Sequence, residues 1–198
     1  MGVVKLSTAG ILDYQKYSSF LAGNASYSPG SYDLIQSEIL TGSQASVTFD
    51  VTGLGSTYQH LQLRIAAKST DPTNDMDNLI VRFNSDSAGN YSHHRLFGNG
   101  SSVVSYAGTS TTYCFAGMTT RGSGSTFAAA VLDILDPFET TKYTTTRSLT
   151  GGTNSSQNAI VLQSGNWRNT AALTAITLDQ GGGGNFVSGS SFTLIGVK

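Results

Sequence analysis

Three carboxylates that stand close together in the sequence could do hydrolytic chemistry. Asp133, Asp136 and Glu139 share one short segment, and glycosidases use a pair of carboxylates held at a fixed separation. The same segment also fits a strand that ends and turns at Pro137. No G-x-S-x-G motif supplies a serine nucleophile. We therefore expect no catalytic residues and a protein that is not an enzyme.

A second group of oxygen ligands could bind a metal ion. Asp71, Asn74, Asp75 and Asp77 crowd one loop, and hard oxygen ligands suit Ca²⁺. The EF-hand spacing is absent, and a solvated acidic turn is the interpretation that we favour. His93–His94 is the other candidate, but neighbours on a strand point to opposite faces and cannot easily share one metal. We expect no metal site.

A run of four glycines, Gly181–Gly184, could cradle a phosphate. Phosphate-binding loops need glycine at set offsets between a strand and a helix, whereas a strand-like segment, 185–187, follows here. The run therefore predicts a flexible hairpin tip and no cofactor. The single cysteine, Cys114, cannot form an internal disulfide and lies in a strand-like segment, which indicates a buried, inert thiol.

The only tryptophan could contact a sugar. Trp167 lies beside Asn166 and Arg168, and an exposed indole can stack on a sugar ring. The alternative is a large apolar anchor at the edge of a sheet. Both interpretations stay open at this point.

These residues must be positioned by β-strands, because apolar and polar residues alternate along many short segments. Leu61, Leu63 and Ile65 alternate with Gln62 and Arg64, and a period of two places them on opposite faces of a strand. Repeated between Gly- and Ser-rich turns, the pattern predicts an all-β fold, an antiparallel β-sandwich that is jelly-roll-like. The expected strands are 33–41, 45–51, 59–68, 78–84, 91–97, 102–107, 110–117, 126–135, 142–149, 158–164, 173–179 and 186–197.

The first 31 residues differ from the rest and predict a short helical arm. Five apolar residues fall near one helical face, and a helix this short must pack on something. They are the candidate partner-anchoring residues Ile11, Tyr14, Tyr17, Phe20 and Leu21. The helix can dock on its own sandwich or on a neighbouring subunit. We therefore expect an arm, 1–31, followed by a β-sandwich domain, 32–198.

Composition excludes several classes of partner. Charged residues make up 12% of the chain and the formal net charge is -1, so no basic stripe is available for nucleic acid. No stretch reaches the roughly 18 apolar residues that span a membrane. The start of the chain lacks the apolar core of a signal peptide. We expect no nucleic-acid or membrane partner and synthesis in the cytosol without secretory export.

Several segments, taken in order, resemble a β-sandwich module of virion structural proteins of tailed bacteriophages. The resemblance covers roughly residues 32–198. The segments that carry it are 32–35 (YDLI), 58–64 (YQHLQLR), 82–86 (RFNSD), 90–102 (NYSHHRLFGNGSS), 133–136 (DILD), 142–143 (KY), 167–172 (WRNTAA) and 192–198 (FTLIGVK).

This resemblance implies a non-enzymatic virion part that is assembled in the host cytoplasm. We expect an exterior capsid decoration or cement protein, a homo-oligomer such as a trimer, with phage capsid or tail proteins as its other partners. The alternative is a tail-fibre, spike or baseplate module that contacts the host surface, including its glycans, through a surface formed by Trp167, the Gly-rich tips and the tyrosines Tyr91, Tyr106 and Tyr113. Only about 30 residues precede the module, and no fibre shaft is present, which favours the capsid.

Overall fold

The computed structural model describes residues 31–71, 75–121, 125–154 and 157–198. The predicted helical arm, with Ile11, Tyr14, Tyr17, Phe20 and Leu21, lies outside these residues. The sheets belong to the compact unit Tyr32–Lys198. Within the described residues no helix is long and apolar enough to cross a membrane.

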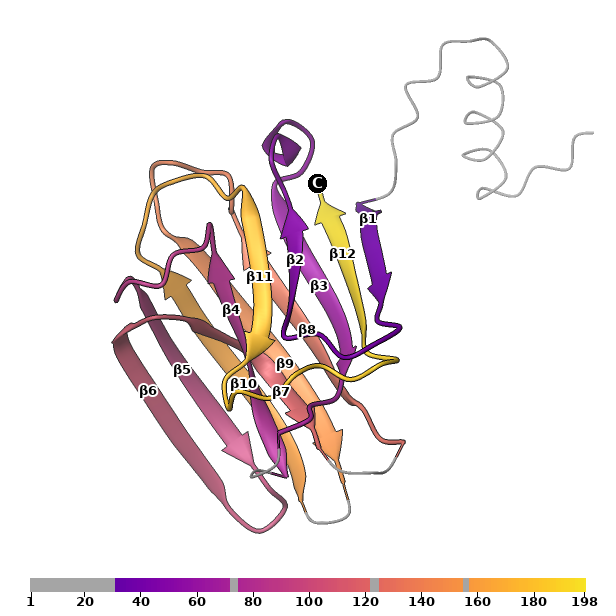
Figure 1. Ribbon diagram of the computed structural model, residues 1–198. Helices are drawn as coiled ribbons and strands as arrows, with labels where there is room; N and C mark the ends of the chain where they lie inside the picture. Colours follow the sequence, from indigo (N-terminus) through magenta and orange to yellow (C-terminus); the bar gives the residue numbers. More distant parts are fainter. Residues whose placement is uncertain (1–30, 72–74, 122–124, 155–156) are drawn as a thin grey trace, which may run out of the picture. The chain divides into compact units, whose positions relative to one another are not determined.

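The described residues form two antiparallel sheets (Figure 1). The large sheet has the order β1 (Tyr32–Ile39), β12 (Ser191–Val197), β3 (His60–Ala67), β8 (Ala128–Leu135), β9 (Thr144–Thr153), β10 (Asn158–Trp167), β5 (Tyr91–Gly98), β6 (Val103–Thr111). The small sheet has the order β2 (Ser46–Asp50), β11 (Ala175–Gln180), β4 (Met76–Phe83), β7 (Cys114–Thr120). A short 3-10 turn, Leu54–Ser56, precedes β3.

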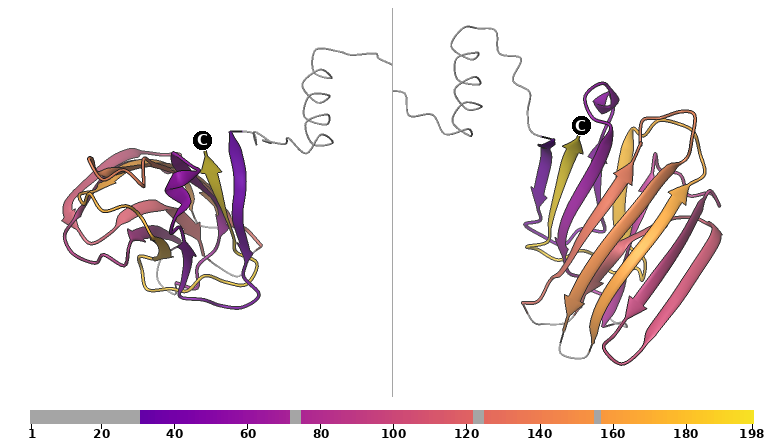
Figure 2. Two further views of the ribbon diagram at one scale, coloured as in Figure 1. Left: turned by 90° about the horizontal axis from the view of Figure 1, so that it is seen from above. Right: turned by 180° about the vertical axis from the view of Figure 1, so that it is seen from behind.

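The chain passes repeatedly between the two sheets. Each of the pairs β1–β2, β3–β4, β7–β8 and β11–β12 has one strand in each sheet. The hairpins β5–β6 and β9–β10 remain in the large sheet and widen it beyond β8. The views of Figure 2 show the large sheet as a curved layer with the small sheet on one side of it.

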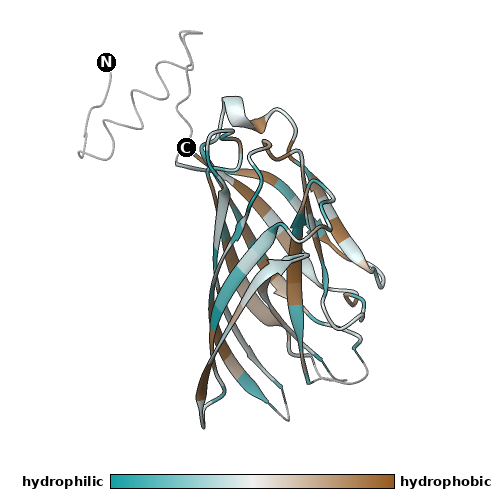
Figure 3. Cartoon of the chain, turned by 90° about the vertical axis from the view of Figure 1, so that its left-hand side faces the viewer, coloured by the Kyte–Doolittle hydropathy of each residue, from teal (hydrophilic) through white to brown (hydrophobic). Residues whose placement is uncertain are grey.

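The predicted alternation is confirmed and supplies the core between the sheets. Along β3, Leu61, Leu63 and Ile65 are buried, while the intervening side chains reach the surface. Figure 3 shows the same alternation of apolar and polar residues along other strands. The β1–β12 ladder contains a register shift between Leu34 and Gln36. The all-β fold with two antiparallel sheets, consistent with a sandwich, is thus confirmed.

The last predicted strand, 186–197, is longer than the observed one. β12 begins only at Ser191, and residues 184–190 form a loop. In that loop Phe186 is fully buried and makes isolated bridges to Gln44 and Ser69. A left-handed turn at Gly189, with φ of 87°, separates this segment from β12. The apolar segment therefore closes one side of the core instead of extending the ladder.

Candidate functional site

Two of the three carboxylates of the 133–139 segment, Asp133 and Asp136, form ion pairs at the surface. Asp133 accepts hydrogen bonds from Gln62 (2.8 Å) and from Arg147 Nη2 (2.8 Å). Asp136 accepts one from Lys142 Nζ at 2.6 Å. Partial burial opposes ionisation of Asp133, but its hydrogen bonds outweigh that effect and lower its pKa. The bond from Lys142 likewise lowers the pKa of Asp136. Neither carboxyl therefore has the raised pKa of a general acid.

Trp167 is a core anchor. It is 1% exposed, and its Nε1 donates a hydrogen bond to Asp86 Oδ2 at 2.7 Å. Its ring lies against Phe83 and Tyr91, with centroid distances of 5.9 and 6.5 Å. The ring offers no surface to a sugar, so the predicted glycan contact at Trp167 does not fit this structure. The indole is buried because its single polar group is satisfied inside the fold.

Cys114 lies in the core, and the side chains of His93 and His94 point to opposite faces of their strand. Cys114 is fully buried, and burial raises its thiol pKa to about 12. His93 packs on Phe115, with ring centroids 4.3 Å apart, whereas His94 is exposed. The two imidazoles therefore occupy opposite faces of β5.

The predicted solvated acidic turn is wrong for two of its residues. Asp71 and Asp77 are 1% and 2% exposed. Asp77 accepts hydrogen bonds from the Gly182 amide (2.8 Å) and from Ser69 Oγ (3.2 Å). Burial raises the Asp77 pKa in spite of these bonds. Asn74 lies outside the described residues. No three His, Cys, Asp or Glu side chains in the described part of the chain are grouped so that they could hold a metal.

The predicted flexible tip at Gly181–Gly184 is instead packed against the start of β4. The Gly181 amide donates to the Asn78 carbonyl at 2.7 Å. A Cβ at Gly182 would lie 2.7 Å from Asp71 Oδ2 and 2.8 Å from Asp77 Oδ1. The glycines are needed there because the chain crosses directly over two buried carboxylates.

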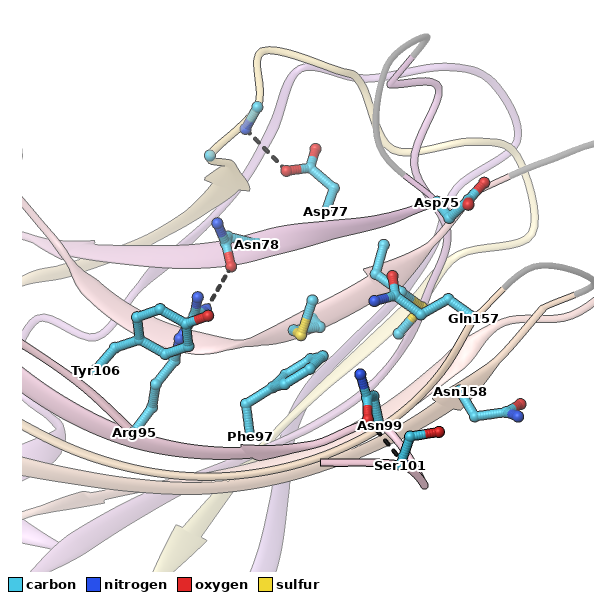
Figure 4. A pocket seen from close by; sticks show the side chains of 14 residues that line it. Asp75, Asp77, Asn78, Arg95, Phe97, Asn99, Ser101, Tyr106, Gln157 and Asn158 are labelled. Atoms are coloured by element: carbon cyan, nitrogen blue, oxygen red, sulfur yellow. Dashed lines mark hydrogen bonds between the residues drawn. The ribbon is translucent and has the colours of Figure 1, made fainter. Parts of the chain in front are cut away.

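A polar pocket of about 770 Å³, here called the end pocket, lies beside this crossing. Ligand pockets typically measure about 300–1,000 Å³. Side chains from β4, β5 and β6 approach one another across it (Figure 4). Its lining residues include Asp77, Asn78, Arg95, Phe97, Tyr106 and Asn158.

Arg95 is the most constrained side chain of the end pocket. Its guanidinium carbon lies 4.5 Å from the Tyr106 ring centroid and 4.6 Å from that of Phe115. Its Nη1 donates to Asn78 Oδ1 at 2.7 Å. Among the described residues no carboxylate forms an ion pair with it. Its Nε is buried and has no hydrogen-bond partner. Burial lowers the Arg95 pKa, but guanidinium stays charged at any ordinary pH.

The opposite side of the large sheet carries a second feature, here called the outer apolar face. Its members are large apolar side chains that are 38–68% exposed: Val131, Leu149, Leu162, Leu96, Ile160 and Val103. The first four form one row across the sheet, in which each residue is the direct cross-strand partner of the next, from β8 through β9 and β10 to β5. Ile160 and Val103 both pair with Gly98 in the adjacent row. A hollow of about 520 Å³ adjoins them, lined partly by Phe127, Gly151 and Ile160.

Of the tyrosines predicted to contact a host surface, Tyr106 lines the end pocket, whereas Tyr91 is fully buried. The residue patterns pointed to neither feature as a whole. For the outer apolar face a signal existed, because Ala159–Leu162 is a run of four apolar residues. Such a run in a strand puts apolar side chains on both faces. For the end pocket no such signal existed, since nothing in the local pattern of His93–Phe97 shows that Arg95 faces inward.

Comparisons of the sequence with protein families and with curated proteins found no match.

Proposed function

We propose that the chain is a non-enzymatic structural protein on the exterior of a tailed-bacteriophage particle, a capsid decoration protein that acts as a homo-oligomer. It is assembled with the particle in the host cytoplasm. Its partners are copies of itself and the capsid proteins that it bridges. Binding only to the assembled shell stabilises that shell by mass action.

The strand order supports a jelly roll, the finer form of this sandwich. β1-β12-β3-β8 in one sheet and β2-β11-β4-β7 in the other reproduce an eight-stranded double sheet with Greek-key connections. The β5–β6 and β9–β10 hairpins are then insertions that widen one sheet. Viral capsid domains and lectins are among the proteins built on jelly rolls. A fold alone does not establish function, which depends on the sites and surfaces that the fold carries.

The outer apolar face is the observation that carries the proposal. Contiguous exposed apolar surface on a β-sheet marks an interaction site. We assign a second copy of the chain as its occupant, because none of its six members is charged, with Arg64 only bordering it as the partner of Val131, and the whole chain has a net charge of -1. Copies therefore approach without strong repulsion. Three copies that turn this face toward a common axis form a closed trimer.

Sedimentation velocity tests the assembly proposal. In sedimentation velocity the wild-type chain runs as a trimer, and the double variant Leu149→Ser, Leu162→Ser runs as a monomer with unchanged circular dichroism. The matched control Tyr143→Ser removes an equally exposed aromatic ring, 49% exposed, outside the face and leaves the trimer intact. A wild-type monomer at working concentrations would refute the self-association.

Immunogold labelling of particles of the phage that encodes the chain tests the location. Gold over the head is the expected result. Gold on the tail would exclude the decoration role and support a tail-fibre, spike or baseplate module instead. Absence of the chain from a blot of purified particles excludes both virion roles.

The end pocket favours one second candidate, a tail-fibre, spike or baseplate module that contacts host-surface glycans. Its lining combines aromatic rings with amide and charged groups, and polar groups of this kind fix the orientation of a bound ligand. The glycan-contact residues of this candidate are then those of the end pocket and not Trp167.

A further inference from the structure

We propose that the end pocket binds a neutral saccharide, with Arg95 and Tyr106 as its principal contacts. This inference rests on the second candidate function for its biological use. It names the ligand class and the residues, and it can be tested on the purified chain alone.

Arg95 is held rigidly as a hydrogen-bond donor. The rings of Tyr106 and Phe115, each within 4.6 Å of the guanidinium carbon, and the Asn78 amide oxygen restrict its position. With one of its donors used by Asn78 and no ion-pair partner in the described residues, the guanidinium has donors left for a ligand. A donor that is fixed before binding loses little conformational entropy when it binds.

A buried polar side chain, Gln163, lies next to Arg95 in the large sheet. Gln163 is the direct cross-strand partner of Arg95 on β10 and is 2% exposed. Both polar atoms of its amide lack a hydrogen-bond partner, as does Arg95 Nε. Buried polar atoms without partners are rare in native proteins and call for an explanation. Gln163 does not line the pocket, so a buried water, and not the ligand, would satisfy its amide.

The mixture of donors and acceptors fits hydroxyl groups. Asp75, which is exposed, contributes carboxylate oxygens, while Asn99 and Asn158 contribute amides on the other side (Figure 4). Each sugar hydroxyl both donates and accepts, so it needs both kinds of partner. Asp75 and Asp77 line the same pocket as Arg95, and these acidic groups disfavour a polyanion as the ligand.

Apolar surface completes the site. Phe97, Met118 and the Tyr106 ring line the same pocket. Aromatic rings pack against the apolar face of a ligand, while polar groups beside them fix the orientation of that ligand. The C–H face of a pyranose ring is an apolar face of this kind. A saccharide thus uses both parts of the lining.

The experiment uses the full purified chain on an array of neutral oligosaccharides and bacterial polysaccharides. The array carries oligomers of glucose, galactose, mannose and N-acetylglucosamine together with acidic polysaccharides. We expect binding to a neutral member, confirmed by calorimetry. Both Arg95→Ala and Tyr106→Ala weaken it by about tenfold or more, the loss expected for a charged hydrogen bond or a stacking contact.

The matched control is Arg147→Ala, which removes an exposed guanidinium from the outer face of the same sheet and leaves saccharide binding unchanged. Tyr106 lies on an edge strand and is 48% exposed, so its variant keeps the test valid if Arg95→Ala fails to fold. Binding to no neutral saccharide, or binding that neither pocket variant weakens, overturns the proposal. Binding only to acidic polysaccharides that is lost in about 0.5 M NaCl, where charge attraction is screened, also overturns it.

These outcomes are separate from those of the virion proposals. A negative array leaves the particle labelling and the oligomer measurement standing. A positive array with gold only over the head retains the saccharide site and removes the tail location.

Discussion

At the scale of single residues, burial decides the chemistry of Cys114. Its Sγ lies 3.5–3.6 Å from the carbonyl oxygens of Ser92 and Asn166, with no exposed surface. Burial raises its pKa from 9.0 to about 12. We predict that a chromogenic disulfide reagent at about pH 8 does not react with the folded chain. The same reagent should titrate one thiol per chain in denaturant, because only the thiolate attacks.

The same shift sets the sign of a pH effect. The Cys114 thiol ionises near pH 9.0 in the unfolded chain and near pH 12 in the folded chain. The contribution of the neutral thiol to the free energy of unfolding is therefore complete below about pH 9 and is lost as the pH rises toward 12. Denaturant unfolding should therefore show a smaller alkaline loss of stability for Cys114→Ala than for the wild type. Equal alkaline losses in the two proteins would contradict the assignment.

At the scale of elements, the packing of β7 against β8 and β9 depends on a missing side chain. A Cβ at Gly117 would lie 2.6 Å from Thr150 Oγ1 and 3.1 Å from Ala130 Cβ. We predict that Gly117→Val separates these strands and lowers the free energy of unfolding by about 1–3 kcal/mol, the usual cost of overpacking. Urea denaturation measures the difference.

The control for this prediction is Gly151→Val on β9. A Cβ there meets nothing within 4 Å, and the residue is exposed. Its stability should stay within about 0.5 kcal/mol of the wild type, as for ordinary surface changes. An equal loss in both variants would mean that valine disfavours these strands for a reason other than the close approach.

At the scale of the whole molecule, few charges and an exposed apolar face define how copies meet. Charged residues are only 12% of the chain, and the outer apolar face contains none of them. We predict that self-association is as strong at about 0.5 M NaCl as at about 0.05 M, because salt screens charge attraction and does not weaken apolar contact. Sedimentation equilibrium at both concentrations measures it, and dissociation in high salt would indicate a charged interface instead.

Local pattern was enough to predict the strands and the burial of Cys114. Alternation with a period of two is a property of neighbouring residues, so the twelve expected segments overlap the twelve strands seen in the described residues. The ends were less accurate, as with the 186–197 segment. Its apolar residues fit a ladder equally well, but Phe186 is held in a loop by distant partners.

What the sequence determined by itself was therefore the all-β class, the positions of most strands and the scarcity of charge. Only the tertiary structure decided that Trp167 is buried, that Arg95 faces a pocket and that Leu149, Leu162 and Leu96 form one row. The physical reason is that these outcomes depend on which strands pair and in which register. Such contacts join residues far apart in the chain, as when Gly182 donates to Asp77 across 105 positions, and no local pattern encodes them.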